Sequence, residues 1–346
     1  MIFWRRTALS LRITVTYGMK NTYYLGVDIG GTKCAVLAGT EKMEILERIQ
    51  FATETSRGPE YAIDKLLENA SKIIQKRKGQ LPVAIGISCG GPLDSREGLI
   101  LSPPNLPGWD NIPITNIFED KFGVPVFLQN DANASALAEW RFGAGQNTKN
   151  MIFLTFGTGL GAGMILDGRL YTGTNDLAGE IGHIRLAEDG PEGYGKNGSF
   201  EGFCSGAGIA RLAREVIGKM LQNGEKVAFV KSEEELRGIT AKSLAAAAEK
   251  GDPTAIEIFQ VSGKYLGIGL SILIDILNPQ RIVIGSIYAR NPHFFQAACQ
   301  EVLQREPLRQ AAEVCEVVPA ALGEQVGDYA CLSVAMMGKL RSPHQI

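Results

Sequence analysis

Apolar residues along this chain of 346 residues form two kinds of pattern: short continuous runs, and longer stretches at helical spacing. Runs at 24–27 and 34–37 flank one glycine-rich turn, and runs at 151–154 and 162–166 flank another. A strand, a Gly/Thr turn and a second strand predict a β-hairpin, so we expect two hairpins. The segment 61–76 has apolar residues at a helical period and a charged opposite face, which predicts an amphipathic helix.

Strands and helices are expected to alternate along the rest of the chain. We expect further strands at 45–53, 82–88, 124–128 and 282–285, and further helices at 132–142, from about 205, after 240, over 253–277 and after 328. This order, with a hairpin in each half, predicts an α/β fold of two domains with related topology around a central cleft. Residues 1–21 are expected to be a disordered extension. Residues 22–128 with a C-terminal helix at 329–346 are expected to form a small domain, and residues 129–328 a large one.

Composition and charge exclude several classes of protein. The chain has 35 Lys and Arg against 37 Asp and Glu, so it carries no electrostatic footprint for nucleic acid or an anionic membrane. Its 6 cysteines are scattered, without a C-x-x-C pair, which is typical of reduced thiols in a cytoplasmic protein. No apolar run reaches membrane-spanning length, and the nearest, 265–277, contains Asp275. We therefore expect a cytoplasmic protein with no nucleic-acid or membrane partner.

The two glycine-rich turns are the strongest candidates for chemistry. Their sequences are Asp-Ile-Gly-Gly-Thr-Lys at 28–33 and Thr-Phe-Gly-Thr-Gly-Leu-Gly at 155–161. Glycine lets backbone N–H groups approach an oxyanion closely, and threonine hydroxyls add donors. One such hairpin commonly only turns the chain. Two that face each other across a cleft would hold the phosphate tail of a nucleotide from both sides.

Seven motifs, in order, resemble those of the ROK family of sugar kinases, within the actin-like ATPase superfamily. They are DIGGTK (28–33), GGP (90–92), PNLPGW (104–109), NDANA (130–134), GTGLG (157–161), GEIGH (179–183) and Glu201 in FEGFCSG. The resemblance covers about residues 24–340, and it implies two actin-like, ribonuclease H-like domains around a cleft. It also implies ATP-dependent phosphorylation of a hexose, with ATP and Mg²⁺ as cofactors and a homodimer as the assembly.

Asp131 is the candidate general base. A hexose hydroxyl is a poor nucleophile and needs a base as it attacks the γ-phosphorus. Asp131 stands between a predicted strand and a predicted helix, so the residues alone are equally consistent with a helix cap at Asn130 or Asp131. The resemblance favours the base, and the two neighbours can also share capping and catalysis.

The resemblance carries the phosphate and metal contacts over to the two turns. Asp28 is a candidate Mg²⁺ ligand acting through water, or an acid that hydrogen-bonds its own turn. Thr32 and Thr158 are expected to contact phosphate, whereas Lys33 either contacts phosphate or is a solvated hairpin residue. The backbone candidates for ATP binding are Gly30, Gly31, Gly157, Gly159 and, beside the adenine, Gly285.

Sugar recognition needs donors and acceptors that converge on vicinal hydroxyls. By motif, the resemblance implies the sugar-binding set Gly91, Asn105, Asn130, Asp131, Glu180, His183 and Glu201. Glu180 and His183 stand three residues apart and would share a face on one helical turn. The chain has 3 histidines, and only His183 falls in a motif.

The segment after His183 departs from the family pattern. Many relatives carry three cysteines there that complete a tetrahedral zinc site, but this chain has Glu192, Tyr194 and Ser199 at those positions. One histidine cannot hold structural zinc, so none is expected to bind. We expect the loop shape to persist, with Tyr194 and Phe200 packing where relatives hold the metal.

The substrate expected from the resemblance is glucose, phosphorylated to glucose 6-phosphate. The PNLPGW loop resembles glucokinase-type members more than N-acylmannosamine kinases. An N-acetylmannosamine or N-acetylglucosamine kinase remains the alternative, because a small change near position 2 of the ring would admit an acetamide. The missing zinc ligands raise a third alternative, a non-catalytic sugar-binding protein. A sugar-responsive repressor is not expected, because Asp28 comes too early to leave room for a helix-turn-helix domain.

Overall fold

The first predicted hairpin forms the centre of a five-stranded sheet. In the computed structural model, which describes residues 22–337, β1 (Tyr24–Ile29) pairs antiparallel with β2 (Lys33–Gly39), and β2 with β3 (Ile45–Ala52). On its other side β1 pairs in parallel with β4 (Ile85–Cys89), and β4 with β7 (Val126–Asn130). The strand order is therefore β3-β2-β1-β4-β7.

The second predicted hairpin is the centre of a second sheet with the same topology. β8 (Met151–Leu154) pairs antiparallel with β9 (Ala162–Leu166), and β9 with β10 (Arg169–Tyr171). β13 (Arg281–Ile284) lies parallel between β8 and β14 (Glu316–Pro319). The order β10-β9-β8-β13-β14 repeats that of the first sheet. The predicted α/β fold with two units of related topology is thus confirmed.

Helices and short loops connect these strands. The α-helices of the described residues are α1 (Gly58–Lys76), α2 (Ile114–Phe122), α3 (Asp131–Phe142), α4 (Phe200–Phe203), α5 (Gly206–Gln222), α6 (Glu233–Arg237), α7 (Ala241–Ala248), α8 (Pro253–Leu277), α9 (Ser286–Arg290), α10 (Pro292–Leu303), α11 (Arg309–Ala312) and α12 (Val326–Ala335). Single turns of 3₁₀ helix are η1 (Thr55–Arg57), η2 (Ile181–His183) and η3 (Gly323–Gln325). The loops contain two small strand pairs, β5 (Leu93–Asp94) with β6 (Leu99–Ile100) and β11 (Glu192–Gly193) with β12 (Lys196–Asn197).

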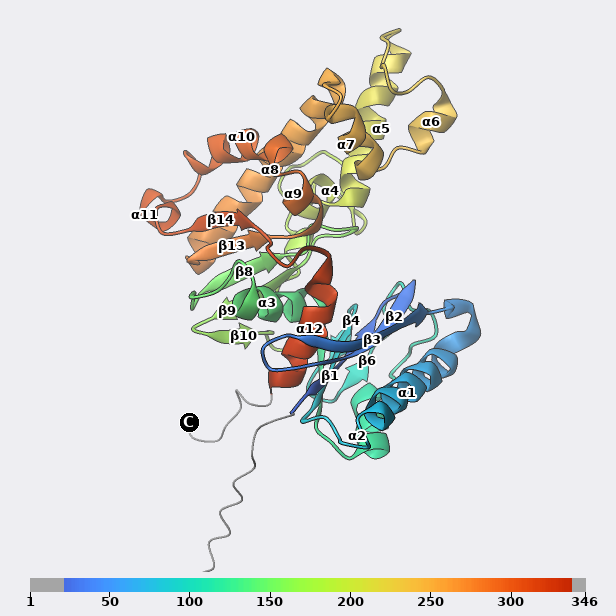
Figure 1. The fold of residues 1–346 in the computed structure, drawn as a ribbon. Coiled ribbons are helices and arrows are strands. Elements are labelled where there is room, and N and C mark those ends of the chain that lie inside the picture. Colours follow the sequence, from blue (N-terminus) through green and yellow to red (C-terminus); the bar gives the residue numbers. More distant parts are fainter. Residues whose placement is uncertain (1–21, 338–346) are drawn as a thin grey trace, which may run out of the picture.

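Sheets and helices stack in alternating layers (Figure 1). One face of the first sheet packs on α1 and α2, and its other face packs on α12, which in turn packs on α3. In the second sheet, Met151 and Phe153 of β8 belong to a core shared with α3 and α12. The alternate residues Ile152 and Leu154 belong to a larger core with α5 and α8. The helices α3 and α12 therefore lie between the two sheets.

The C-terminal helix α12 approaches the first sheet very closely. A Cβ atom at Gly86 of β4 would overlap the backbone of Ala335, so only glycine permits this contact. The predicted start of this helix at 329 was wrong, because α12 begins at Val326 and that boundary cuts through it. The boundary at 128/129 likewise falls inside β7. The rest of the predicted helix, 338–346, and the predicted extension 1–21 lie outside the described residues.

A buried carboxylate ties α3 to the segment before α12. The Glu139 side chain belongs to a residue that is 0% exposed. It accepts hydrogen bonds from the backbone N–H groups of Ala144 (2.8 Å), Ala321 (3.2 Å) and Leu322 (2.9 Å). A buried carboxylate needs hydrogen-bond donors, and these three N–H groups supply them. Glu139 thereby fixes where the chain leaves the second sheet toward α12.

The predicted apolar helix at 253–277 is α8. By length and composition alone it could cross a membrane, but half of its most apolar window is buried inside the protein. α10 packs along it, and the Phe259 ring contacts Phe294 and Phe295 of that helix at 5.2 Å between centroids. α8 therefore has the contacts of a core helix.

Candidate active site

The carboxyl ends of three parallel strands bring the motifs of the first sheet to one edge. Ile29 at the end of β1 is level with Cys89 at the end of β4, and Cys89 is level with Asn130 at the end of β7. The residues that follow these strands are the first glycine turn, the GGP turn and the start of α3. Ligands of open α/β sheets bind beyond the carboxyl ends of the strands, so this edge is the candidate site.

The first glycine turn lies against the loop that contains Asn105. A Cβ atom at Gly31 would overlap the Asn105 carbonyl oxygen, so this approach requires glycine. A Cβ atom built at Gly90 would lie 3.4 Å from Asn105 Oδ1. Asn105, Thr32 and Gly91 are exposed. Three motifs that are distant in the sequence therefore meet here and leave polar groups open to a ligand.

The second glycine turn lies at the corresponding edge of the second sheet. Gly285 follows β13 and donates its N–H to the Leu154 carbonyl at the end of β8 (2.9 Å). Gly206, at the start of α5, donates to the Gly157 carbonyl (2.7 Å), and Gly157 also lies beside Ser286. The structure thus groups the turn and the segment after β13, which the sequence predicted around ATP, with the start of α5. Gly285 itself is buried, so a nucleotide would contact the residues around it rather than Gly285.

Asp131 begins α3, between the two sheets. The side chain of Asn130 accepts a hydrogen bond from the Asn133 N–H (2.8 Å), so Asn130 is the helix cap. Asp131 Oδ1 accepts from the Ala132 N–H (2.8 Å), and the residue is exposed on its free side. Desolvation by the surrounding protein raises the pKa of Asp131. Hydrogen bonds from the backbone N–H groups of Ala132 and Asp131 lower it, but desolvation is the larger effect. A carboxylate with a raised pKa accepts a proton more readily, which suits a general base.

Asp28 belongs to the same acidic region. Burial raises its pKa to about 6; the charges of Asp328 and Asp131 add to this shift, and those of Lys33 and Arg48 oppose it. Among residues 22–337, no hydrogen bond reaches the Asp28 carboxylate. A crowded carboxylate without a donor is stabilised by a cation, so Asp28 fits the role of a Mg²⁺ ligand acting through water.

Sequence reasoning missed Arg48 and Asp328. Arg48 lies on the edge strand β3 and Asp328 in the first turn of α12. Arg48 Nε donates to both Asp328 oxygens, at 2.9 and 2.8 Å. Neither residue stands in a motif, and 280 positions separate them in the chain, so only the fold brings this pair beside Asp28.

The predicted sugar-binding residues of the second unit lie near Asp131. Glu180 and His183 share one turn, but it is the 3₁₀ turn η2 rather than an α-helical one. Burial raises the pKa of Glu180; His183 opposes this shift, and Asp131 and Glu201 add to it. Glu201 Oε2 accepts the N–H of Leu160 in the second glycine turn (2.9 Å). The structure brings these four side chains into one neighbourhood, and their binding of a sugar stays a prediction.

The segment where many relatives carry zinc ligands forms the β11–β12 hairpin. Ser199 caps α4 by accepting the Gly202 N–H (3.1 Å), and Phe200 is fully buried. Tyr194 stands at the tip of the hairpin with its ring against His183, 4.7 Å between centroids, although the residue is 65% exposed. Whether this contact replaces a metal ion stays a prediction. Within the described part of the chain, no three His, Cys, Asp or Glu side chains are arranged to hold a metal ion. The absence of structural zinc stays a prediction.

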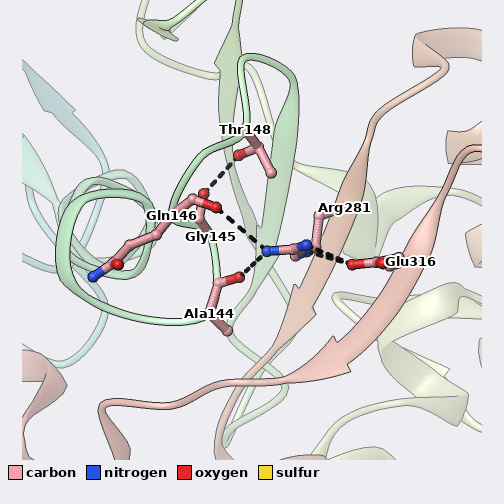
Figure 2. Close-up of polar contacts among 6 residues, drawn as sticks. All are labelled: Ala144, Gly145, Gln146, Thr148, Arg281 and Glu316. Atoms are coloured by element: carbon pink, nitrogen blue, oxygen red, sulfur yellow. Dashed lines mark hydrogen bonds and ion pairs between the residues drawn. The ribbon is translucent and has the colours of Figure 1, made fainter.

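A surface hollow of about 510 Å³ lies at the opposite edge of the second sheet. Arg281 in its lining binds Glu316 and donates to the Ala144 carbonyl (2.7 Å), while Thr148 Oγ1 donates to the Gly145 carbonyl (2.7 Å) (Figure 2). These contacts hold the loop 144–148 against the sheet. None of the predicted site residues lines this hollow, so it is not the candidate site.

Comparison with known proteins identifies the family of this chain. The sequence profile of the ROK family matches residues 24–334. The chain belongs to the ROK family. It is 31% identical to the glucokinase of Halalkalibacterium halodurans over 315 residues, 89% of this chain and 93% of that one. The crystal structure of the ROK hexokinase from Thermus thermophilus matches at a TM-score of 0.75 and 30% identity, over 92% of this chain and 99% of that one. The ROK glucokinase of Streptomyces griseus, solved with glucose and AMPPNP, matches at a TM-score of 0.71 and 30% identity. The match covers 91% of this chain and 98% of that one.

ROK proteins of other function are also similar to this chain. The N-acetylmannosamine kinase of Citrobacter koseri is 30% identical over 75% of this chain and 82% of that one. A xylose repressor of Caldicellulosiruptor bescii is 27% identical over 92% of this chain and 79% of that one. Membership of the ROK family therefore supports a sugar kinase without choosing its sugar.

Proposed function

We propose that this ROK protein phosphorylates a hexose with ATP, and that its substrate is glucose, converted to glucose 6-phosphate. One observation carries the proposal: the open Asp131 carboxylate, with its raised pKa, begins a helix between two glycine turns and lies near Glu180, His183 and Glu201. Phosphoryl transfer needs a base at the acceptor hydroxyl and donors at the phosphates, and this arrangement supplies both.

Asp131 is the proposed base. It would take the proton of the 6-hydroxyl as that oxygen attacks the γ-phosphorus, while Asn130 caps α3 and keeps the carboxylate at the helix start. The exposed Thr32 and Thr158 and the backbone of both turns would donate to the phosphates. Mg²⁺, when bound, would neutralise phosphate charge.

Replacing Asp28 with asparagine should weaken the response to Mg²⁺. We expect the Mg²⁺ concentration for half-maximal activity to rise about 10- to 100-fold, because the carboxylate that orients the ion's water would be gone. Sugar affinity measured without nucleotide should not change. The control is Asp64→Asn, an exposed acid of α1 away from the site. If the Mg²⁺ dependence of activity did not change, Asp28 would not be a Mg²⁺ ligand and would have only a structural role in its turn.

Glucose is proposed over an N-acetylhexosamine because the glucokinases of Halalkalibacterium halodurans and Streptomyces griseus are similar over most of their length. The similarity to an N-acetylmannosamine kinase keeps that substrate as the second candidate. We further propose a cytoplasmic homodimer; light scattering on purified protein would test the dimer.

The test is ADP release with Mg-ATP in the presence of glucose, mannose, fructose, N-acetylglucosamine or N-acetylmannosamine. We expect the highest kcat/KM with glucose. Asp131→Asn protein purified in the same way controls for contaminating kinases. Turnover of N-acetylmannosamine alone would replace the proposed substrate. Sugar binding without turnover of any sugar would identify a non-catalytic binding protein.

A further inference from the structure

Tyr194 occupies an unfavourable backbone position at the tip of a tight hairpin. β11 and β12 pair with Glu192 opposite Asn197 and Gly193 opposite Lys196, which leaves a loop of two residues, Tyr194 and Gly195. Both have positive φ, 52° and 68°. Such two-residue turns favour Asn, Asp or Gly, because a larger side chain is strained there by about 1–2 kcal/mol. A tyrosine held in this conformation calls for a compensating role.

The turn places the Tyr194 ring against His183. The two ring centroids are 4.7 Å apart with an interplanar angle of 38°. The backbone of His183 is held from the same hairpin, because Lys196 Nζ donates to its carbonyl oxygen (2.7 Å). Two hydrogen bonds to β11 hold the hairpin in place. Ser199 Oγ donates to the Gly193 carbonyl (3.3 Å), and Arg211 donates to the Glu192 carbonyl. One rigid element therefore determines where the imidazole points.

The hairpin places Tyr194 beside the predicted sugar-binding residues. A Cβ atom built at the neighbouring Gly193 would lie 3.1 Å from Glu201 Cβ. Burial raises the pKa of the Tyr194 phenol, and the charges of Glu201, Glu180 and Asp131 add to the shift. At the same time the residue is 65% exposed. An exposed aromatic ring beside three acids and a histidine leaves a face and a hydroxyl available to a polyhydroxylated ligand.

We propose that Tyr194 is a positioning residue of the sugar site that orients His183 through ring contact, and that this role compensates for the strain of its turn. The inference rests on the proposed function, since it assigns Tyr194 to the same hexose site. It adds a residue from the loop that has Glu192, Tyr194 and Ser199 where the family resemblance leads us to expect cysteines.

The decisive variant is Tyr194→Asn. Asparagine tolerates the positive φ better than tyrosine, so the melting temperature should stay the same or rise. The KM for glucose should rise about tenfold because the ring contact is lost, with kcat changed less than about threefold. Tyr194→Phe should restore the KM if the ring positions His183. Tyr171→Asn, at an exposed tyrosine of β10, is the matched control and should leave the KM unchanged.

A readout independent of turnover separates this inference from the proposed function. Glucose binding measured by calorimetry without ATP should weaken in Tyr194→Asn and recover in Tyr194→Phe. The imidazole proton signal of His183, assigned with a His183→Asn variant, should shift in Tyr194→Asn as the ring current disappears. Equal glucose affinity in all three proteins would overturn the inference even with an active kinase, as would unfolding of Tyr194→Asn. Absence of turnover with the binding differences intact would overturn only the proposed kinase activity.

Discussion

Asp131→Asn should lower kcat by about 10²- to 10⁴-fold, the range that a positioned general base contributes. Glucose affinity should be nearly unchanged, because asparagine has the same shape and keeps an oxygen for the Ala132 N–H. The variant should also be at least as stable at neutral pH. In the folded protein desolvation raises the pKa of Asp131, so the ionised side chain disfavours the fold above that pKa, and asparagine removes this effect. Steady-state kinetics, calorimetry and thermal unfolding measure the three quantities.

The pH profile provides a second measurement of the same residue. Asp131 works as a base only when it is deprotonated, so kcat/KM should fall as the pH falls through its raised pKa. This acid limb should lie above the value of about 4 that is ordinary for aspartate, and it should be absent from the residual activity of Asp131→Asn. The control is Asp167→Asn, in the turn between β9 and β10. If Asp131→Asn had a near-normal kcat and an unaltered acid limb, Asp131 would not be the general base.

Glu139→Ala should produce the largest loss of stability. The substitution removes the acceptor of three backbone N–H groups and opens a cavity at a fully buried position between α3 and the segment 320–325, so we expect the free energy of unfolding to fall by about 3–5 kcal/mol. Glu139→Gln should lose less, because one oxygen remains to accept. Urea titrations followed by circular dichroism give the difference.

The control for this loss is Glu301→Ala, at an exposed glutamate of α10 whose ion pair with Arg305 lies at 3.5 Å. A surface pair of this kind should change the free energy of unfolding by about 0.5 kcal/mol or less. Comparable losses in both variants would show that the three hydrogen bonds of Glu139 are not what stabilises the fold at this point.

Local patterns predicted the parts of the fold whose signal is local. The two hairpins follow from apolar runs on either side of a glycine turn, and α7 begins after Thr240 as its capping sequence indicates. Strand ends were predicted less accurately: the strands predicted at 82–88 and 124–128 run instead over Ile85–Cys89 and Val126–Asn130. Pairing decides those ends, since β4 is paired with β1 and β7 with β4, whereas both predicted runs begin before the paired residues.

Contacts between distant segments could not be predicted from the sequence. In the sequence, nothing distinguishes Glu139 from an exposed helical glutamate. Its role depends on the segment 320–325, whose N–H groups donate to it only in the folded protein. Arg48 and Asp328 have no motif, and their pairing requires the C-terminal helix to lie on the first sheet. Tyr194 stands at a motif position whose usual residue is a cysteine, so the sequence indicated what was missing rather than what the tyrosine contacts.

The position of α12 has a consequence for synthesis of the protein on the ribosome. Residues 24–130 form a sheet whose second face, including Tyr24 and Leu37, is covered in the described part of the chain chiefly by α12 at 326–335, with a smaller contribution from α3. At about 5–20 residues per second, the intervening chain takes roughly 10–40 s to make, and the apolar face stays uncovered for that time. Nascent chains that stop before residue 326 would therefore expose it permanently, and we expect them to be clients of chaperones, whereas the completed chain buries it as its last step.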